Sequence, residues 1–267
     1  IYTGEDTLSL HDALPICWCA ASALGSIRSE KAVDGLIKAL NDPDIEVQYH
    51  SASALGWIGS EKAVDPLVLL LGNERPPKPR VAAAYALYGI KSTKTIAPLI
   101  QYLTDADSKV RAAVAFALGG APSEEAIEPL LKCLSDSSYQ VIQNAVYALG
   151  NLGSERAVPY LLNLLGGKIG HQMIESVIGA LISSERKEAF GPLLRMLLSG
   201  FQVDSPYLRA QVNTDLFASA LPDLLENEDK HIRRKAAEII SYYCTGQDVS
   251  YRLASLSESD SDDEIRH

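Results

Sequence analysis

Side chains that could catalyse a reaction or bind a metal are few and scattered along this sequence. Four cysteines stand at positions 17, 19, 133 and 244, and only Cys17 and Cys19 are close, which fits neither a zinc site nor a disulfide framework. Three histidines are isolated: His50, His171 and His231. Because a Gly-rich phosphate loop and a nucleophile elbow are also absent, we expect reduced, mostly buried thiols, no catalytic residue, no bound metal and no cofactor.

Aromatic residues at a fixed spacing offer another chemistry, the binding of an apolar surface. Tyr85, Phe116 and Tyr147 follow one another at intervals of 31 residues. Aromatic rings provide much contact area at a low entropy cost, so an aligned strip can hold a partner protein, a peptide helix or a planar chromophore. The same rings can instead pack as core between repeated units, and both interpretations remain open from the sequence.

This spacing belongs to a repeat that runs through most of the chain. Its anchor is the leucine of an Ala-Leu-Gly motif or a close variant, and the anchors are 31 or 32 residues apart: Leu24, Leu55, Leu87, Leu118, Leu149 and Leu181. A period of this length indicates that each unit is one supersecondary element, which buries its apolar face only against its neighbours.

Each unit is predicted to contain two helices. A Ser-Glu-x-Ala-Val turn, whose serine is expected to cap the helix, precedes the first helix. Apolar residues then recur at the spacing of one helix face, with a proline such as Pro66 in the first turn. The second helices are predicted over residues 47–58, 79–90, 110–121 and 141–152, and the motif glycine is expected to let the chain leave each of them.

The arrangement LxxLLxDxDxxVRxxAxxALGxIGSExAV resembles the HEAT family, in its short variant called the PBS lyase HEAT-like repeat. The resemblance covers residues 17–245 and implies an all-α fold, an armadillo-like right-handed α-solenoid (α-α superhelix) of about seven helix pairs. After Leu181 the anchor spacing stretches to 35 and then shrinks to 24 residues. We expect the solenoid to occupy residues 17–247.

In this architecture the second helices line the concave surface. When the first apolar residue of each second helix is counted as position 0, positions 2, 3, 6 and 10 point away from the buried positions. The candidate partner-binding residues on this face are Tyr49, His50, Trp57, Tyr85, Phe116, Gln143, Asn144, Tyr147, Asn151 and Glu175.

The resemblance also implies a structural ladder of Arg and Asp side chains along the stack. Its Arg position is held by Arg80, Arg111, Arg209 and Arg233, and it is interrupted by Gln48, Ile142 and Ile174. HEAT metalloenzymes such as deoxyhypusine hydroxylase hold two irons through His-Glu dipeptides, and this sequence has none. HEAT-like alkyl-purine DNA glycosylases need a basic face, which the acidic composition disfavours.

The two ends of the chain differ from the repeat. The stretch EDTLSLHDALPI resembles translated sequencing-adapter sequence, so residues 1–16 are expected to be a non-native extension, with the native chain entering near Cys17. Residues 248–267 are acidic and Ser-rich, a composition that predicts disorder.

Charge and hydropathy exclude several classes of function. Lys and Arg number 24 against 34 Asp and Glu, a net charge of −10, which disfavours nucleic-acid binding. The apolar runs are too short for a membrane helix, and a secretory signal is not evident, so we expect a cytoplasmic protein.

These observations predict a non-enzymatic scaffold or assembly chaperone that binds another protein or a peptide on its concave face. The alternative, implied by the PBS lyase HEAT-like resemblance, is a phycobilin lyase subunit or a phycobilisome-associated bilin-handling factor. Its partner would be a bilin or a phycobiliprotein.

Overall fold

Helices account for all the regular structure within the described residues. The computed structural model describes residues 10–72, 74–166, 170–184 and 233–234. The chain divides into two compact units, Ile1–Leu152 and Gly153–His267. The first unit holds α1 (Leu10–Ile27), α2 (Val33–Ala39), α3 (Ile45–Ile58), α4 (Val64–Leu70), α5 (Pro77–Ile90), α6 (Ile96–Gln101), α7 (Ser108–Leu118), α8 (Ile127–Cys133) and α9 (Tyr139–Leu152), and the second holds α10 (Val158–Leu165) and α11 (His171–Ser183).

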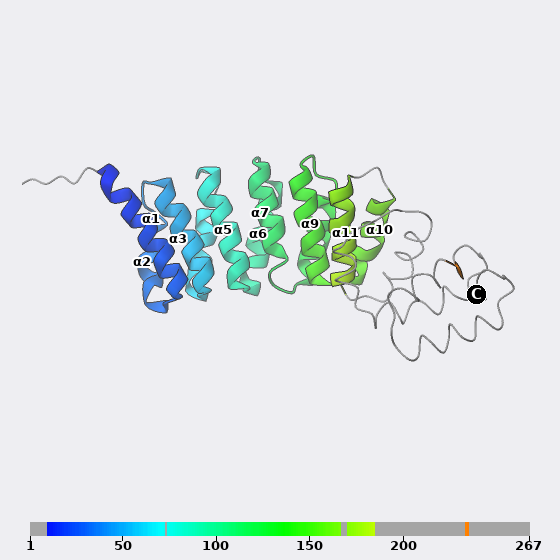
Figure 1. The fold of residues 1–267 in the computed structure, drawn as a ribbon, viewed down its shortest axis with the longest axis horizontal. Coiled ribbons are helices and arrows are strands. Elements are labelled where there is room, and N and C mark those ends of the chain that lie inside the picture. The colour runs from blue at the N-terminus through cyan, green and yellow to red at the C-terminus, as the bar shows by residue number, and fades with distance from the viewer. Residues whose placement is uncertain (1–9, 73, 167–169, 185–232, 235–267) are drawn as a thin grey trace, which may run out of the picture. The chain divides into compact units, whose positions relative to one another are not determined.

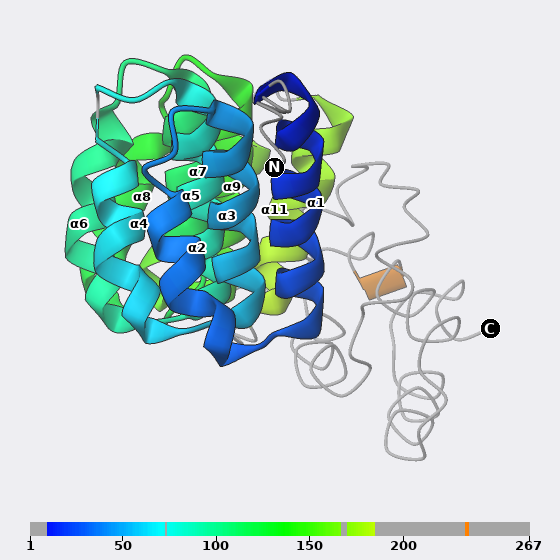
Figure 2. The same cartoon turned by 90° about the vertical axis from the view of Figure 1, so that its left-hand side faces the viewer.

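The helices of the first unit form two layers (Figure 1, Figure 2). The second helices α1, α3, α5, α7 and α9 lie side by side in one layer, and the first helices α2, α4, α6 and α8 form the other. Contacts are most extensive between successive second helices, and α3, α5, α7 and α9 each also pack on the first helix of their own pair. The predicted all-helical solenoid is therefore confirmed.

The first helix of each pair begins as the proline and turn signals predict. The Ser-Glu-x-Ala segments fold as single-turn 3-10 helices, such as Glu61–Ala63, and the α-helix begins at the next residue. Pro66 is the third residue of α4, where the missing backbone N–H costs no helical hydrogen bond. Two of the second helices, α3 and α7, are capped by aspartates, because the side chains of Asp44 and Asp107 accept hydrogen bonds from Glu46 N and Lys109 N at 2.7 Å.

The serines of the Ser-Glu motif cap their helices at one position only among the described residues. Ser123 accepts a hydrogen bond from Glu125 N, as predicted. Ser29, Ser60 and Ser154 form no side-chain cap, so the capping prediction is wrong there. The Ser60 hydroxyl instead donates to the Glu30 carboxylate at 2.6 Å and joins two successive units. Ser92, at the equivalent position of a unit without the motif glutamate, likewise donates to Glu61 at 3.1 Å.

The motif glycine has a role that the turn argument did not predict. Gly56 lies inside α3, and a Cβ atom there would stand 2.6 Å from the Cα of Ala86 in α5. Its missing side chain therefore allows two second helices to approach closely. The chain leaves α3 at Gly59, whose φ of 77° is in the left-handed region that favours glycine. Gly119 directly follows α7, but its φ of −77° is open to any residue, so the predicted need for glycine to leave the helix is not met there either.

The second unit contributes one described pair. Val158 and Leu161 of α10 and Val177 and Leu181 of α11 are buried, so this pair repeats the apolar faces of the first unit. The pairs expected after Leu181, including the position of Arg209, lie outside the described residues, as do the acidic residues 248–267. Helix α1 runs across the boundary predicted at residue 16, and the proposed division of the chain stays a prediction.

Candidate functional site

Three of the predicted residues form a continuous group of rings on α5, α7 and α9, and a fourth ring joins them. Phe116 stacks on Tyr147 with ring centroids 4.9 Å apart and an angle of 6° between the rings. Tyr85 meets Phe116 edge to face at 5.5 Å, and the centroid of the Tyr88 ring lies 4.4 Å from that of Phe116. We call Tyr85, Tyr88, Phe116 and Tyr147 the aromatic cluster.

The aromatic cluster lies at the surface of the second-helix layer. Tyr85 is 47% exposed and Tyr147 is 41% exposed, whereas Tyr88 and Phe116 are half-buried. Neither Tyr85 nor Tyr147 belongs to the buried core. The rings that contact one another across three repeats are thus also open to solvent.

Two hydroxyls tie the cluster together at its edge. The Tyr88 and Tyr147 hydroxyl oxygens are 3.2 Å apart and share a hydrogen bond. That bond, followed by burial, raises the pKa of Tyr88 to about 12. Hydrogen bonds with Tyr88 and Asn151 lower the pKa of Tyr147 from its usual value. The cluster therefore presents apolar ring faces together with oriented polar groups.

Acidic residues are missing from the helices that carry the cluster. In a chain with 34 Asp and Glu residues, α5, α7 and α9 contain neither type. In α3 the single acid is Glu46, whose carboxylate accepts a hydrogen bond from Lys78 Nζ at 2.5 Å. The exposed face of α3, α5, α7 and α9, which we call the second-helix face, is far less acidic than the chain as a whole.

The predicted residues of α3 form a second group. The rings of Tyr49 and His50 meet edge to face at 5.0 Å, and the Lys78 ammonium lies 5.1 Å from the centroid of the Tyr49 ring. His50 Nδ1 is 3.5 Å from the hydroxyl of Ser22 in α1. Trp57 is exposed and packs over Gly25 of α1. These contacts run from α3 to both neighbouring second helices.

The remaining predicted residues divide between the surface and the interior. Asn151 is exposed and Gln143 is half-buried. Asn144 is buried, and its Nδ2 donates to Ala112 O at 2.8 Å, so its side chain joins α9 to α7. The expectation that position 3 faces away from the core is wrong here and at Ala82 and Ala113, which are buried too. Glu175 is half-buried on α11, in the second unit.

Tyr88 was missed because it stands where most repeats have the motif glycine. Position 88 directly follows Ala86-Leu87, and Gly89 takes over the close approach, since a Cβ there would lie 2.6 Å from Gly56 O. Gly120 leaves room for the new ring, because a Cβ at that residue would be 2.8 Å from Tyr88 Cδ2. A tyrosine in a glycine position, opposite a Gly-Gly pair in the next repeat, was the signal available in the sequence.

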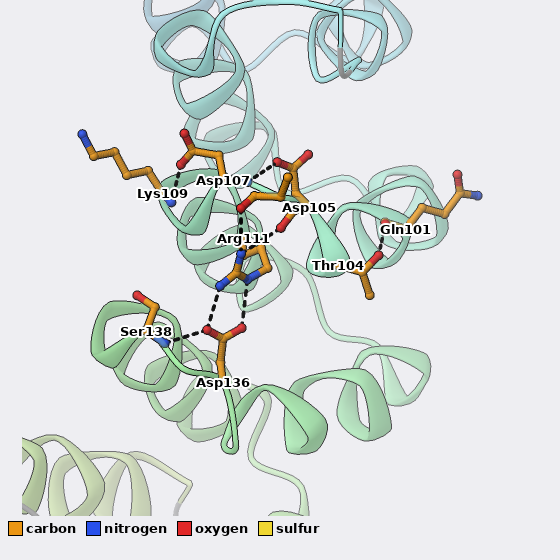
Figure 3. A network of polar contacts seen from close by, with 9 residues as sticks. Gln101, Thr104, Asp105, Asp107, Lys109, Arg111, Asp136 and Ser138 are labelled. Atoms are coloured by element: carbon orange, nitrogen blue, oxygen red, sulfur yellow. Dashed lines mark hydrogen bonds and ion pairs between the residues drawn. The ribbon is translucent and has the colours of Figure 1, made fainter.

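Charged residues form the predicted ladder at the turns that lead into α7 and α9 (Figure 3). Arg111 Nε and Nη2 each donate to the Asp136 carboxylate at 2.9 Å, and Nη1 donates to Asp105 O at 2.8 Å. Arg80 donates to the Asp105 carboxylate, and its Nε donates to Leu71 O at 2.9 Å. Arg111 holds the pKa of Asp136 below its usual value. The ladder is confirmed at both arginines, and these pairs connect successive repeats.

Gln48 departs from this ladder, as predicted. Its Nε2 donates to Asp42 O at 2.6 Å, a local contact within its own turn. Arg209 lies outside the described residues. Among the cysteines, Cys133 is buried, and this burial raises the pKa of its thiol to about 11, whereas Cys19 is exposed. Of the two cysteines in the described residues for which burial is given, one is thus buried and one exposed.

The described residues contain neither a candidate metal site nor a candidate membrane span. No three His, Cys, Asp or Glu side chains among them lie where they could share a metal ion. No helix in the same ranges is both long and apolar enough to cross a membrane.

The stacked helical pairs and the ladder between them define an α-solenoid. The family model for HEAT repeats matches residues 18–88 and 96–182, more than half of the chain, and the protein belongs to this family. Residues 79–105 also match the PBS lyase HEAT-like repeat. Among curated proteins no significant match was found.

Solved structures show the same type of fold. An engineered protein is similar with a TM-score of 0.52 and 23% identity, over 91% of this chain and 77% of that chain. A homology model of the full-length AP-3 complex in an intermediate open conformation has a TM-score of 0.59 and 15% identity, over 95% of this chain and 53% of that chain. The complex of CpcE and CpcF of phycocyanin lyase from Nostoc sp. PCC7120 reaches 25% identity over 76% and 73%, but its TM-score is only 0.42.

Proposed function

We propose that this protein is a non-enzymatic scaffold that binds a polypeptide partner on its second-helix face, with the aromatic cluster as the anchor. The observation that carries this proposal is the surface position of rings that already contact one another across three repeats. Exposed aromatic side chains in a fixed arrangement bind a partner with little further loss of side-chain entropy. We further propose that this binding takes place in the cytoplasm.

The surroundings of the cluster favour a polypeptide as the ligand. Asn151 is exposed beside Tyr147, and Gln143 lies one helical turn before it on α9. Their amide groups can donate to and accept from a peptide backbone. Since α5, α7 and α9 carry no acid, a partner with apolar or acidic side chains meets no like charge from these helices.

Selection of peptides followed by variant binding tests this proposal. Peptides are selected on the full chain from a phage-displayed random library, and their Kd is measured by fluorescence anisotropy. For the variant Tyr85→Ala/Tyr147→Ala we expect binding weaker by roughly 30-fold or more, because anchor residues at an interface contribute about 2 kcal/mol or more.

The matched control changes two exposed apolar residues of first helices, Leu69→Ala/Tyr160→Ala. This variant should bind the peptides as the wild type does, and both variants should keep the wild-type helical circular dichroism. Equal loss of binding in the two variants, or peptides that bind the Tyr85/Tyr147 variant unchanged, would exclude the cluster as the anchor.

A second candidate function is the handling of a bilin chromophore. It draws on the match of residues 79–105 to the PBS lyase HEAT-like repeat, a segment that includes Tyr85 and Tyr88. Flat, partly exposed rings can stack on a conjugated chromophore. Co-expression with a bilin and a phycobiliprotein tests this candidate: covalently attached colour would support it, and a colourless phycobiliprotein alongside retained peptide binding would leave the scaffold as the function.

A further inference from the structure

The aromatic cluster has polar groups along one side, toward the carboxyl-terminal ends of α5 and α9. The hydroxyls of Tyr88 in α5 and Tyr147 in α9 are 3.2 Å apart, although α7 lies between these two helices (Figure 1). Asn151 follows Tyr147 by four residues on α9, and Lys91, the C-cap of α5, follows Tyr88 by three. Lys91 and Asn151 are both exposed. We call Tyr88, Lys91, Tyr147 and Asn151 the polar edge.

Two glycines at the end of α7 allow the polar edge to form. Gly119 and Gly120 directly follow Leu118, the last residue of α7. A Cβ atom at residue 120 would stand 2.8 Å from Tyr88 Cδ2, so a larger residue there would displace the Tyr88 ring. The ring instead lies over the end of α7, and its hydroxyl reaches that of Tyr147 in a bond that is exposed to solvent.

The hydrogen bonds at Tyr147 leave its own proton available to a ligand. Both Tyr88 and Asn151 lower the pKa of Tyr147, which is the effect of a neighbour that donates to the phenol oxygen. The pKa of Tyr88 is raised, which is the opposite effect and fits the donor of the pair. Because its oxygen accepts from two neighbours, Tyr147 can donate its O–H to an acceptor outside the chain.

The charge at the polar edge is positive. Lys91 is close enough for its charge to lower the pKa of Tyr147. Within the described residues Lys91 takes part in no ion pair, unlike Lys78 and Lys94. The three helices that carry the cluster contain no acidic residue. A hydroxyl donor beside an ammonium group, with no carboxylate on the same helices, complements a carboxylate of a ligand.

We propose that the polar edge binds the carboxylate of an Asp or Glu side chain of the polypeptide partner, and that a neighbouring apolar side chain of the partner lies on the exposed rings of Tyr85 and Tyr147. The carboxylate accepts a hydrogen bond from the Tyr147 hydroxyl and pairs with the Lys91 ammonium. This inference rests on the proposed function, because the same partner occupies the aromatic cluster, and it adds the chemistry that selects the partner.

Paired peptides test the proposal. Among peptides selected on the full chain from the random phage library, those that need the rings of Tyr85 and Tyr147 should carry an acidic residue next to an apolar one. One such peptide is then made again with each acid replaced by its amide. The full chain should bind the acidic peptide about 10-fold more tightly than the amide peptide, because hydrogen bonds to a charged acceptor are stronger than those to a neutral one.

Two variants assign this preference to the polar edge. Tyr147→Phe keeps the ring of the cluster and removes the hydroxyl, whereas Lys91→Gln removes the charge. Each should weaken binding of the acidic peptide by about 3- to 5-fold more than binding of the amide peptide, and added NaCl should reduce the effect of Lys91→Gln. The matched control, Lys132→Gln, removes an exposed charge from the first helix α8 and should change neither Kd.

The outcomes separate this inference from the proposed function. Peptides that bind Tyr85→Ala/Tyr147→Ala as they bind the wild type exclude the cluster as the anchor, and both proposals fail. Peptides that need those rings but lack an acidic residue, or bind equally as acid and amide, overturn the present inference alone. An acid-over-amide ratio that is the same in the wild type, Tyr147→Phe and Lys91→Gln overturns it as well, because the carboxylate would then bind elsewhere.

Discussion

Helices α5, α7 and α9 carry two regions of opposite character. At the turns that lead into α7 and α9, four charged residues form the ladder: Arg80, Asp105, Arg111 and Asp136. On the exposed face of the same helices, the aromatic cluster carries no charge and leaves two rings partly open to solvent. The ladder charges thus join successive repeats, whereas the aromatic cluster offers uncharged rings to solvent.

The physical reason lies in what each group requires from its surroundings. A buried charge must be paired, so the partners of Arg80 are fixed by the fold. An exposed aromatic ring requires no partner within the chain, so it can bind a partner protein. We therefore expect changes in the ladder to lower stability and changes in the cluster to alter binding with a smaller effect on stability.

The largest effect is expected from Asp105→Ala. Arg80 and Asp105 are both almost fully buried, so the substitution removes the Asp105 carboxylate that pairs with a buried guanidinium. Breaking a buried pair in this way costs about 3 to 5 kcal/mol. Urea denaturation measures this loss.

Asp65→Ala, at an exposed carboxylate in the first turn of α4, is the control and should change the free energy of unfolding by about 0.5 kcal/mol or less. A similarly small loss for Asp105→Ala would mean that the ladder does not hold the repeats together.

A smaller loss is expected from Gly119→Ala, which links the packing of the helices to the cluster. A Cβ at residue 119 would stand 2.8 Å from the Cα of Ala148, so α7 and α9 must separate to accept it. Overpacking of this kind costs about 1 to 3 kcal/mol. The same separation should weaken peptide binding, since Phe116 on α7 stacks on Tyr147 of α9.

The control for this change is Gly35→Ala. A Cβ at Gly35 meets nothing within 4 Å, and alanine favours a helix over glycine by about 0.5 to 1 kcal/mol, so this variant should be more stable than the wild type. If both alanine variants were stabilised, the close approach of the second helices would not be the reason for the motif glycine.

The close approach of helices at the motif glycine could not be predicted from the sequence. The repeat period did predict the helix pairs, the buried leucines, the two described arginines of the ladder and the register of Tyr85, Phe116 and Tyr147. Periodicity fixes the direction of a side chain around its own helix, but it does not give the distance to the next helix. The close approach of α7 and α9 buries Asn144, and that could not be read from the pattern.

The ladder should also make stability depend on pH in the acidic range. Arg111 holds the pKa of Asp136 below its usual 3.8, so this carboxylate contributes stability above that value and loses its contribution as the pH falls through the lowered pKa. Asp136→Asn should therefore be less stable than the wild type by about 1 to 2 kcal/mol at pH 7, and the two proteins should converge as the pH falls through the lowered pKa of Asp136. A difference that stays constant from pH 7 down to the most acidic pH at which both proteins remain folded would contradict a role for the charged pair.

Tyr88→Phe is expected to have the smallest effect on stability. It also tests whether the rings of the aromatic cluster are held together by hydrogen bonding. The change removes one hydroxyl and its hydrogen bond to Tyr147 but keeps the ring on Phe116, so the free energy of unfolding should fall by about 1 kcal/mol or less. The hydrogen bond with Tyr88 is the largest cause of the lowered pKa of Tyr147, so this pKa should rise in the variant. Titration of 13C-labelled tyrosine by NMR, with Tyr147→Phe used to assign the resonance, measures the shift.

Tyr139→Phe serves as the control, because Tyr139 is an exposed ring at the start of α9, and it should leave the Tyr147 titration unchanged. An unchanged pKa of Tyr147 in Tyr88→Phe would show that the two hydroxyls are not joined in solution. The cluster would then be a set of independent rings, whereas the ladder would still be fixed in place by ion pairs between repeats.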